Sequence, residues 1–443
     1  MKIAILSWES LHSIAVGGVA QHVTELAAAL ERRGHEVHVF VRTGQGQNRY
    51  DLIHGVHYHR CPIDLNPDFV TEMNNMCNSL IWHLGEIEAL QGPFDIVHAH
   101  DWMCAKALVQ AKNDRHSNTV ITIHSTEFGR CGNRHVGGYS DRISAIEAEG
   151  IYCADRVIIV SGVLAEEVKR IYKVPNSKLK TIYNGIHCRR FDTPTDPGHV
   201  RRQIGVGPMD PTILFVGRLE YQKGPDLLLE AVPELLQRRA DAKFVFAGDG
   251  TMRWDLERRT NQLGVKHAVR FLGAFNSNRA GQLVRLFKST DAVCVPSRNE
   301  PFGIVILEAW AAQKPVVATE NGGPREIITP GQNGYLVYDN PGSIAWGIHR
   351  IFDDFSNAQS MGKQGRVTAS KSYNWDNIAE QTESLYSEIL GSKTEHEAVG
   401  ALRNIEMEVE KTTSIIEEVE HATVSQEQKV DGIETTSTLQ ALN

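Results

Sequence analysis

Residues 298–308 read Arg298-Asn299-Glu300-Pro301-Phe302-Gly303-Ile304-Val305-Ile306-Leu307-Glu308, and an apolar, strand-like segment at 291–296 comes directly before them. The polar part, with its Pro and Gly, predicts a loop, and the apolar run predicts a helix. The free backbone N–H groups at the start of a helix form an anion site. Glu300 in the loop and Glu308 in the helix could grip hydroxyl groups beside that anion. This combination suits a sugar attached to a phosphate.

The same alternation of strand and helix runs along most of the chain. A first series of strands is expected at 2–7, 36–41, 56–60, 95–99, 120–124, 156–160 and 180–183. A second series is expected at 212–217, 243–247, 269–272, 292–295, 316–318 and 335–338. Such a rhythm predicts mostly parallel sheets with helices on both faces. The fold class is therefore α/β, with two doubly wound domains facing each other across a cleft.

Composition divides the chain into five segments. An N-terminal domain is expected at 1–188 and a second domain at 212–374, joined by a link at 189–211 that is rich in Pro, Gly, Asp and Arg. A closing amphipathic helix is expected at 375–391, followed by a tail at 392–443. The link has little periodicity, as expected of a connection between domains.

The tail is acidic and has few aromatic residues. Residues 392–443 contain 11 Asp and Glu against 4 Lys and Arg, a net charge of 4 − 11 = −7. Such a composition predicts a disordered or loosely helical segment. Short apolar clusters at 415–416 and 439–442 are candidate contacts for a protein partner, the alternative being a solvated tail.

Charge and cysteine usage exclude several classes. Since the whole chain carries −8, the body without the tail is close to neutral, which argues against a nucleic-acid partner. No stretch approaches the roughly 20 apolar residues of a membrane span, and the N-terminal half lacks a strongly basic amphipathic helix, so stable membrane association is not favoured. The N-terminus does not read as a signal peptide. Seven scattered cysteines without a CxxC pair predict reduced thiols and a cytoplasmic location.

Two further loops carry phosphate-binding residue types. Gly17 and Gly18 lie at the first strand-to-helix turn, where glycines allow a backbone to approach a phosphate. The alternative is a flexible connection, and the pair lacks the GxGxxG pattern of a nicotinamide site. Arg218 and Lys223 follow the first strand of the second domain. A guanidinium fork and a compact ammonium suit a diphosphate, the alternative being a solvated turn.

Polar residues also follow strands of the first domain, at the edge where ligands gather in open α/β sheets. His124 ends one such strand and could be structural or belong to a site. Asp101 could accept from a substrate hydroxyl or cap the following helix. His98 and His100 are interpreted as facing opposite sides of a strand and hence as a poor metal pair. With no HExxH-type spacing either, no metal site is predicted.

One more junction is ambiguous. The stretch Asn321-Gly322-Gly323-Pro324-Arg325-Glu326 again joins a strand to a helix. It could line the same cleft as the Glu300 loop. Equally, it could be a tight turn with Pro near the helix start.

Taken together, these motifs resemble the retaining glycosyltransferases of family 4, which have two Rossmann-like domains in the GT-B arrangement. The resemblance covers residues 1 to about 390. Its most specific part is the Glu300-x7-Glu308 spacing with Pro-Phe-Gly inside. The other matching motifs are Gly17-Gly18, His100-Asp101, His124-Ser125, Asn184-Gly185-Ile186, Gly217-Arg218 to Lys223-Gly224, Ala247-Gly248-Asp249-Gly250 and Gly322-Gly323.

The resemblance implies a role for each candidate residue. Arg218 and Lys223 would neutralise the diphosphate of a nucleotide-sugar donor, which Gly17 and Gly18 would approach from the other domain. Glu300 would hold the sugar hydroxyls, with the backbone of Phe302, Gly303, Ile304 and Val305 beside it, and Glu308 would hold the ribose. His124 would lie at the reaction centre, and Asp101 and His124 would bind the acceptor. The catalytic set implied is His124, Arg218, Lys223 and Glu300, with no metal and no cofactor required.

The expected function is transfer of a hexosyl group, glucosyl favoured, from a nucleotide-diphosphate sugar to a hydroxyl of a glycan or small-molecule acceptor. Residues 98–102 also resemble a segment of glycogen and starch synthases. Those enzymes carry a Lys before the Gly-Gly pair, where this chain has Ile14-Ala15-Val16. The alternatives are a nucleotide-sugar epimerase or hydrolase on the same fold, and a non-catalytic sugar-nucleotide sensor. A glucan phosphorylase is disfavoured because no sign of a pyridoxal phosphate site is seen.

Overall fold

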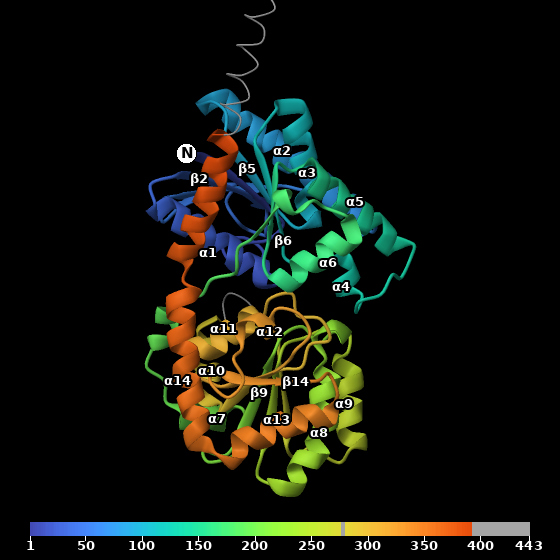
Figure 1. Ribbon diagram of the computed structural model, residues 1–443, viewed down its shortest axis with the longest axis vertical. Coiled ribbons are helices and arrows are strands. Elements are labelled where there is room, and N and C mark those ends of the chain that lie inside the picture. The colour runs from blue at the N-terminus through green and yellow to red at the C-terminus, as the bar shows by residue number, and fades with distance from the viewer. Residues whose placement is uncertain (276–279, 392–443) are drawn as a thin grey trace, which may run out of the picture. The chain divides into compact units, whose positions relative to one another are not determined.

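The computed structural model describes residues 1–275 and 280–391, and Figure 1 shows its two sheets with helices packed around each. Residues 1–386 form one compact unit. The first sheet has the order β3-β4-β2-β1-β5-β6-β7-β8, and all neighbouring strands are parallel except β3 and β4. Its strands are β1 (Lys2–Ser7), β2 (Glu36–Arg42), β3 (Tyr50–Ile53), β4 (Val56–Cys61), β5 (Ile96–His100), β6 (Thr119–Ile123), β7 (Arg156–Ile159) and β8 (Leu179–Thr181).

Helices connect these strands. They are α1 (Gly18–Arg32), α2 (Phe69–Gln91), α3 (Ala105–Arg115), α4 (Glu127–Arg130), α5 (Tyr139–Cys153) and α6 (Gly162–Tyr172), with short 3-10 turns η1 (Trp102–Cys104), η2 (Asn176–Lys178) and η3 (Cys188–Asp192). The alternation places the carboxyl ends of β1, β5 and β6 along one edge of the sheet, so the loops that follow these strands lie at that edge.

The second sheet is entirely parallel, in the order β11-β10-β9-β12-β13-β14. Its strands are β9 (Thr212–Val216), β10 (Lys243–Ala247), β11 (Val269–Gly273), β12 (Ala292–Val295), β13 (Val316–Thr319) and β14 (Gly334–Val337). Its helices and turns are α7 (Pro197–Gln203), η4 (Tyr221–Lys223), α8 (Pro225–Arg238), α9 (Arg253–Gln262), α10 (Ala280–Ser289), α11 (Ile304–Ala311), α12 (Pro324–Ile327), α13 (Pro341–Asp353) and α14 (Phe355–Ser372).

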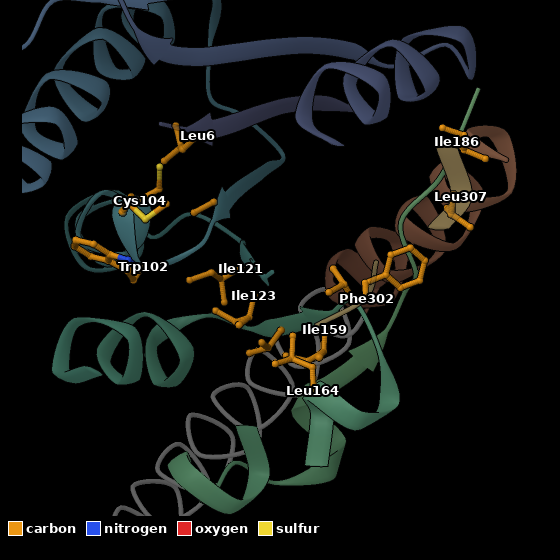
Figure 2. Close-up of a cluster of buried hydrophobic side chains, with 14 of the residues drawn as sticks. Leu6, Trp102, Cys104, Ile121, Ile123, Ile159, Leu164, Ile186, Phe302 and Leu307 are labelled. Atoms are coloured by element: carbon orange, nitrogen blue, oxygen red, sulfur yellow. The ribbon is translucent and has the colours of Figure 1, made fainter. Parts of the chain in front are cut away.

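Burial shows that both faces of the second sheet are covered. In β9, Leu214 packs into one apolar cluster, whereas Ile213 and Phe215 pack into the other. This is the expected result when successive strand residues point to opposite faces and helices cover each face. The first of these clusters also contains Phe302 and Leu307 together with Ile159 of the first sheet, and Figure 2 shows these side chains.

The fold prediction is confirmed, with two local differences. Strand β3 pairs antiparallel with β4 through a hairpin turn with positive φ at His54 and Gly55, and this edge hairpin was not anticipated. Helix α7 lies inside the segment predicted to be an irregular link. Asp196 caps this helix by accepting from His199 N–H, and Pro197 occupies its first turn. A capping residue followed by Pro is a signal for a helix start, but the overall composition of the link does not reveal it. The bounds of the five segments stay a prediction.

Residues 375–391 are helical, as predicted, and this closing helix returns to the first domain. Arg32 donates to Asp376 at 2.6 Å, Arg33 pairs with Glu383, and the Tyr386 hydroxyl lies 2.6 Å from His98 Nδ1. The Trp375 side chain is 1% exposed. A Cβ added to Gly185 would lie 2.6 Å from its indole ring, so only glycine fits there.

Candidate active site

The centre of the site is the loop between β12 and α11. Gly303 has φ +100°, a value that favours glycine, and it immediately precedes Ile304, the first residue of α11. Lys223 Nζ, from the η4 turn, donates to Glu300 Oε2 at 2.8 Å, and Ser297 Oγ donates to the same oxygen at 2.9 Å. Glu300 is 7% exposed. The structure thus places an ammonium and a carboxylate, 77 positions apart in sequence, beside one helix start.

The Gly322-Gly323 turn lies directly against this loop. Gly323 N–H donates to the Glu300 carbonyl at 2.8 Å, and Glu300 and Gly322 form a parallel β-bridge. Gly322 has φ +104°, and a Cβ added there would lie 2.1 Å from the Glu300 carbonyl oxygen. The turn therefore lies beside the Glu300 loop, and it is also a tight turn with Pro324 in the first turn of α12, as the alternative interpretation expected.

Arg218 lies on the same β9-to-α8 connection as Lys223 but has different partners. Its side chain is exposed, and its Nη2 donates to Gln222 Oε1 at 3.2 Å. Because the guanidinium is held by a neutral amide, its charge is not compensated by that contact. Its predicted role toward a diphosphate stays a prediction.

The Gly17-Gly18 turn of the first domain approaches the start of α11. A Cβ added to Gly18 would lie 3.0 Å from Ile304 Cδ1. The turn is held by Glu9, which sequence reasoning missed. Its Oε2 accepts from Val16 N–H at 2.5 Å and Gly17 N–H at 2.8 Å, and burial raises the pKa of this carboxyl. Glu9 lies only two residues beyond β1 and has no motif of its own that could have revealed it.

His124 and Asp101 are joined at the carboxyl ends of β6 and β5. Asp101 Oδ1 accepts from His124 N–H at 2.7 Å, and Asp101 is 3% exposed. Burial raises the pKa of Asp101 to about 6, although the Arg130 guanidinium opposes the change. Asp101 does not cap the following turn through its side chain, so that interpretation was wrong. The half-buried His124 has its pKa lowered to about 3 by burial, so its imidazole is neutral.

The interpretation of His98 and His100 was wrong. Residues two apart on a strand point to the same face, and the two ring centroids lie 4.4 Å apart. Each ring has a different partner: His98 Nε2 lies 2.7 Å from Thr122 Oγ1, and His100 Nδ1 lies 3.1 Å from His124 Nε2. His100 is thus part of the surroundings of His124.

The remaining donor-site candidates lie in or next to α11. Glu308 is half-buried, and burial raises its pKa to about 7, with Arg190 opposing the change. Phe302 is 2% exposed and packs near the Tyr183 and Tyr373 rings. Only its backbone is therefore suited to a ligand. Ile304 and Val305 are half-buried at the first turn of α11.

A second carboxylate joins the two domains beside the site. Glu326 Oε2 accepts from Gly162 N–H at 2.9 Å and from the Tyr183 hydroxyl at 3.2 Å. Ser161 Oγ donates to the Pro301 carbonyl at 2.6 Å, next to Glu300. Helix α6 therefore begins against the Glu300 loop. The sequence analysis identified the turn that contains Glu326, but it could not predict the long-range hydrogen bonds of this side chain.

Two doubly wound domains, whose strand-to-helix loops bring Lys223, Glu300 and Gly18 to one helix start, define a protein of the GT-B fold. Residues 16–190 match the family "Glycosyltransferase Family 4", and residues 199–368 match "Glycosyl transferases group 1".

Relatives extend this match over most of the chain. It is 42% identical over 393 residues to an uncharacterized glycosyltransferase of Methanocaldococcus jannaschii, covering 87% of this chain and 98% of that one. It is 29% identical over 407 residues to a glycogen synthase of Mycobacterium tuberculosis, covering 87% and 94%. The chain therefore belongs to the family 4 glycosyltransferases.

A solved structure agrees on the fold. Sucrose-phosphate synthase from Thermosynechococcus elongatus superposes with a TM-score of 0.75 at 21% identity, covering 88% of this chain and 99% of that one. Within residues 1–275 and 280–391, no helix is both long and apolar enough to cross a membrane. The seven cysteines, all inside the described ranges, are free thiols.

Proposed function

We propose that the protein is a retaining hexosyltransferase that moves a glucosyl group from a nucleotide-diphosphate sugar to a hydroxyl of a glycan or small-molecule acceptor. It needs no metal or other cofactor for this reaction. The observation that carries the proposal is the 2.8 Å contact between Lys223 and Glu300 beside the N-terminus of α11. An ammonium, a buried carboxylate and free helix N–H groups at one place match a phosphate, a sugar and the bond between them.

In the proposed reaction the bond between the sugar C1 and the diphosphate oxygen breaks, and its electron pair leaves with the diphosphate. Lys223 and Arg218 stabilise the charge that grows on that group, and the start of α11 adds its dipole. The acceptor oxygen attacks C1 from the face that the diphosphate leaves, so the configuration is retained. Its proton passes to a phosphate oxygen of the donor.

The other candidates hold the substrates in place. Glu300 accepts from hydroxyls of the transferred sugar, and Glu308 accepts from the ribose. Gly17 and Gly18 let the first domain approach the diphosphate, although the N–H of Gly17 already donates to Glu9. His124 and Asp101 lie on the acceptor side. A glucosyl donor is favoured because a relative over 87% of the chain is a glycogen synthase, and glycogen is a polymer of glucose.

The test begins with a thermal-shift panel of uridine, adenosine and guanosine diphosphate sugars. The correct donor should raise the melting temperature, because a ligand that binds only the folded protein stabilises it. At a concentration 100 times its Kd, the donor should raise the free energy of unfolding by roughly 2.7 kcal/mol. That donor is then incubated with glucose, maltose and longer glucans, and the anomeric configuration of the product is read by NMR. A product with inverted configuration would overturn the retaining mechanism.

The same assay separates the alternatives. Donor incubated alone would give an epimerised sugar if the protein were an epimerase, and rapid release of free sugar if it were a hydrolase. A donor that stabilises the fold without any conversion, with every acceptor tried, would favour a sensor. The cytoplasmic location stays a prediction, and the tail proposed to bind a protein partner lies outside the described residues.

A further inference from the structure

Three histidines from separate elements meet at the edge of the first sheet. His22 lies in α1, His100 ends β5, and His124 follows β6. One side-chain nitrogen from each lies within 4.8 Å of the others. The ring centroid of His22 is 4.5 Å from that of His124 and 5.2 Å from that of His100. These residues are 78 and 24 positions apart in sequence (100 − 22 and 124 − 100), so no spacing motif could have revealed the cluster.

Two ring nitrogens of this cluster, His22 Nε2 and His100 Nε2, have no hydrogen-bond partner among the described residues. His22 Nδ1 lies 2.7 Å from Asn184 Oδ1, an acceptor, so the proton is on Nδ1 and Nε2 carries the lone pair. Both of these Nε2 atoms are buried. His22 is 3% exposed and His100 is 0% exposed. An unpartnered buried nitrogen costs free energy, which a ligand bound at His22 Nε2 would recover.

The spacing suits a tetrahedral metal ion. With Zn–N bonds of about 2.0–2.1 Å, two ligand nitrogens lie about 3.4 Å apart. His100 Nδ1 and His124 Nε2 are already 3.1 Å apart, so bringing in the third nitrogen needs a side-chain shift of the order of 1 Å.

The surroundings resemble those of a ligand set. The Asn184 side chain fixes the His22 ring, as second partners of metal-binding histidines do. The buried Asp101 carboxylate contacts the backbone of His124 and could offset positive charge. His124 is half-buried, so one member of the cluster is partly accessible to solvent.

We propose that His22, His100 and His124 form a site for a single divalent transition metal ion, with Zn²⁺ as the best match. Three imidazole ligands leave a fourth position for water. Resting on the proposed function, bound zinc also inhibits transfer, because it ties His124 to the two other rings and away from the substrates. The ion is a regulator of this site and takes no part in the transfer reaction.

A second histidine pair provides a matched control. His38 Nδ1 lies 3.0 Å from His59 Nε2 in the same sheet, but His38 Nε2 already lies 2.9 Å from Glu36 Oε1. This pair has the same spacing without the unsatisfied nitrogen. His59→Gln should therefore leave metal binding unchanged.

The test is calorimetric titration of the full chain, stripped with a chelator, with ZnCl₂, and a parallel titration with CoCl₂ followed by the absorption of four-coordinate cobalt. We expect one ion per chain, at least a 100-fold loss of affinity in His22→Gln, and a loss of about 10- to 100-fold in Asn184→Leu. Circular dichroism confirms that the variants fold. Wild-type affinity in a folded His22→Gln, or an octahedral cobalt spectrum, overturns the site.

Inhibition is measured separately from binding. With the donor identified, zinc at saturating concentration should abolish transfer by the wild type and His59→Gln, and a chelator should restore it. Binding without inhibition overturns the regulatory role alone. If no donor supports transfer, the proposed function fails while the titrations still decide the metal site.

Discussion

Lys223 and Arg218 illustrate how two cations on one loop can have different environments. Lys223 is half-buried and already contacts Glu300, whereas Arg218 is exposed and donates to the neutral side chain of Gln222. A ligand phosphate would compete with Glu300 for the ammonium but would meet an uncompensated guanidinium at Arg218. The two side chains would thus need different rearrangements to reach the diphosphate of the proposed donor.

Lys223→Ala and Arg218→Ala should each lower turnover by about 10²–10³, because in the proposed reaction each removes one preorganised group that stabilises the leaving diphosphate. The measurement is kcat with the donor found in the thermal-shift panel. Lys169→Ala is the control, since Lys169 pairs with a carboxylate, Glu166, on the surface of α6. Near-normal turnover in a folded Lys223→Ala would count against the assignment.

Glu308 should make donor binding depend on pH. Burial raises its pKa to about 7, so the side chain is ionised above pH 7 and protonated below. The carboxylate accepts ribose hydroxyls better than the acid does, so the donor KM should rise as pH falls through 7. Glu308→Gln should have a raised KM that changes little over the same range. Parallel pH profiles for wild type and variant would disprove the role.

Much of the site could be predicted at the level of residue types, because strand ends and helix starts are local patterns. The Glu300 loop, Lys223 and Gly18 were predicted this way, and the structure brings them to the start of α11, while their roles stay a prediction. Glu9 could not be found, because a single buried carboxylate two residues after a strand has no distinguishing neighbours. The orientation of His98 and His100 was missed for a different reason, since the two-residue period of a strand was misapplied.

At the scale of elements, the turn at Gly322 fixes the position of the Glu300 loop. Gly322→Ala should lower the free energy of unfolding by about 2 kcal/mol or more, because the new Cβ meets the Glu300 carbonyl oxygen at 2.1 Å and φ is +104°. Urea denaturation measures the change. Gly342→Ala is the control, because its nearest neighbour lies 3.7 Å away and its φ is not positive. Equal stability of the two variants would contradict the prediction.

Elements with a continuous run of apolar residues could be predicted from the sequence. A strand at the edge of a sheet and a short helix that depends on its cap could not. Buried parallel strands such as β1 and β10 are unbroken apolar runs, so their bounds matched closely. Strand β3 lies at the sheet edge with exposed and half-buried residues, and it lacks such a run. Helix α7 has seven residues and depends on its Asp196 cap rather than on periodicity.

At the scale of the whole molecule, Glu326 should set how readily the two domains separate. Glu326→Ala removes the acceptor for Gly162 N–H and the Tyr183 hydroxyl, so the free protein should show a larger radius of gyration by small-angle scattering. Glu320→Ala, an exposed carboxylate nearby, is the control. The correct donor should reduce the radius of gyration of the variant, because the two domains close around a bound donor. Identical scattering for both variants, with and without donor, would argue against a hinge motion between the two domains.

The return of the closing helix has a consequence for biosynthesis. The first sheet leaves the ribosome long before Trp375 and Tyr386, which cover Gly185 and His98, have been translated. About 200 residues separate Gly185 from Tyr386, and at roughly 5–20 residues per second their synthesis takes about 10–40 s. Throughout that interval the nascent N-terminal half is incomplete. The N-terminal half reaches its final packing only after the second domain and the closing helix have left the ribosome.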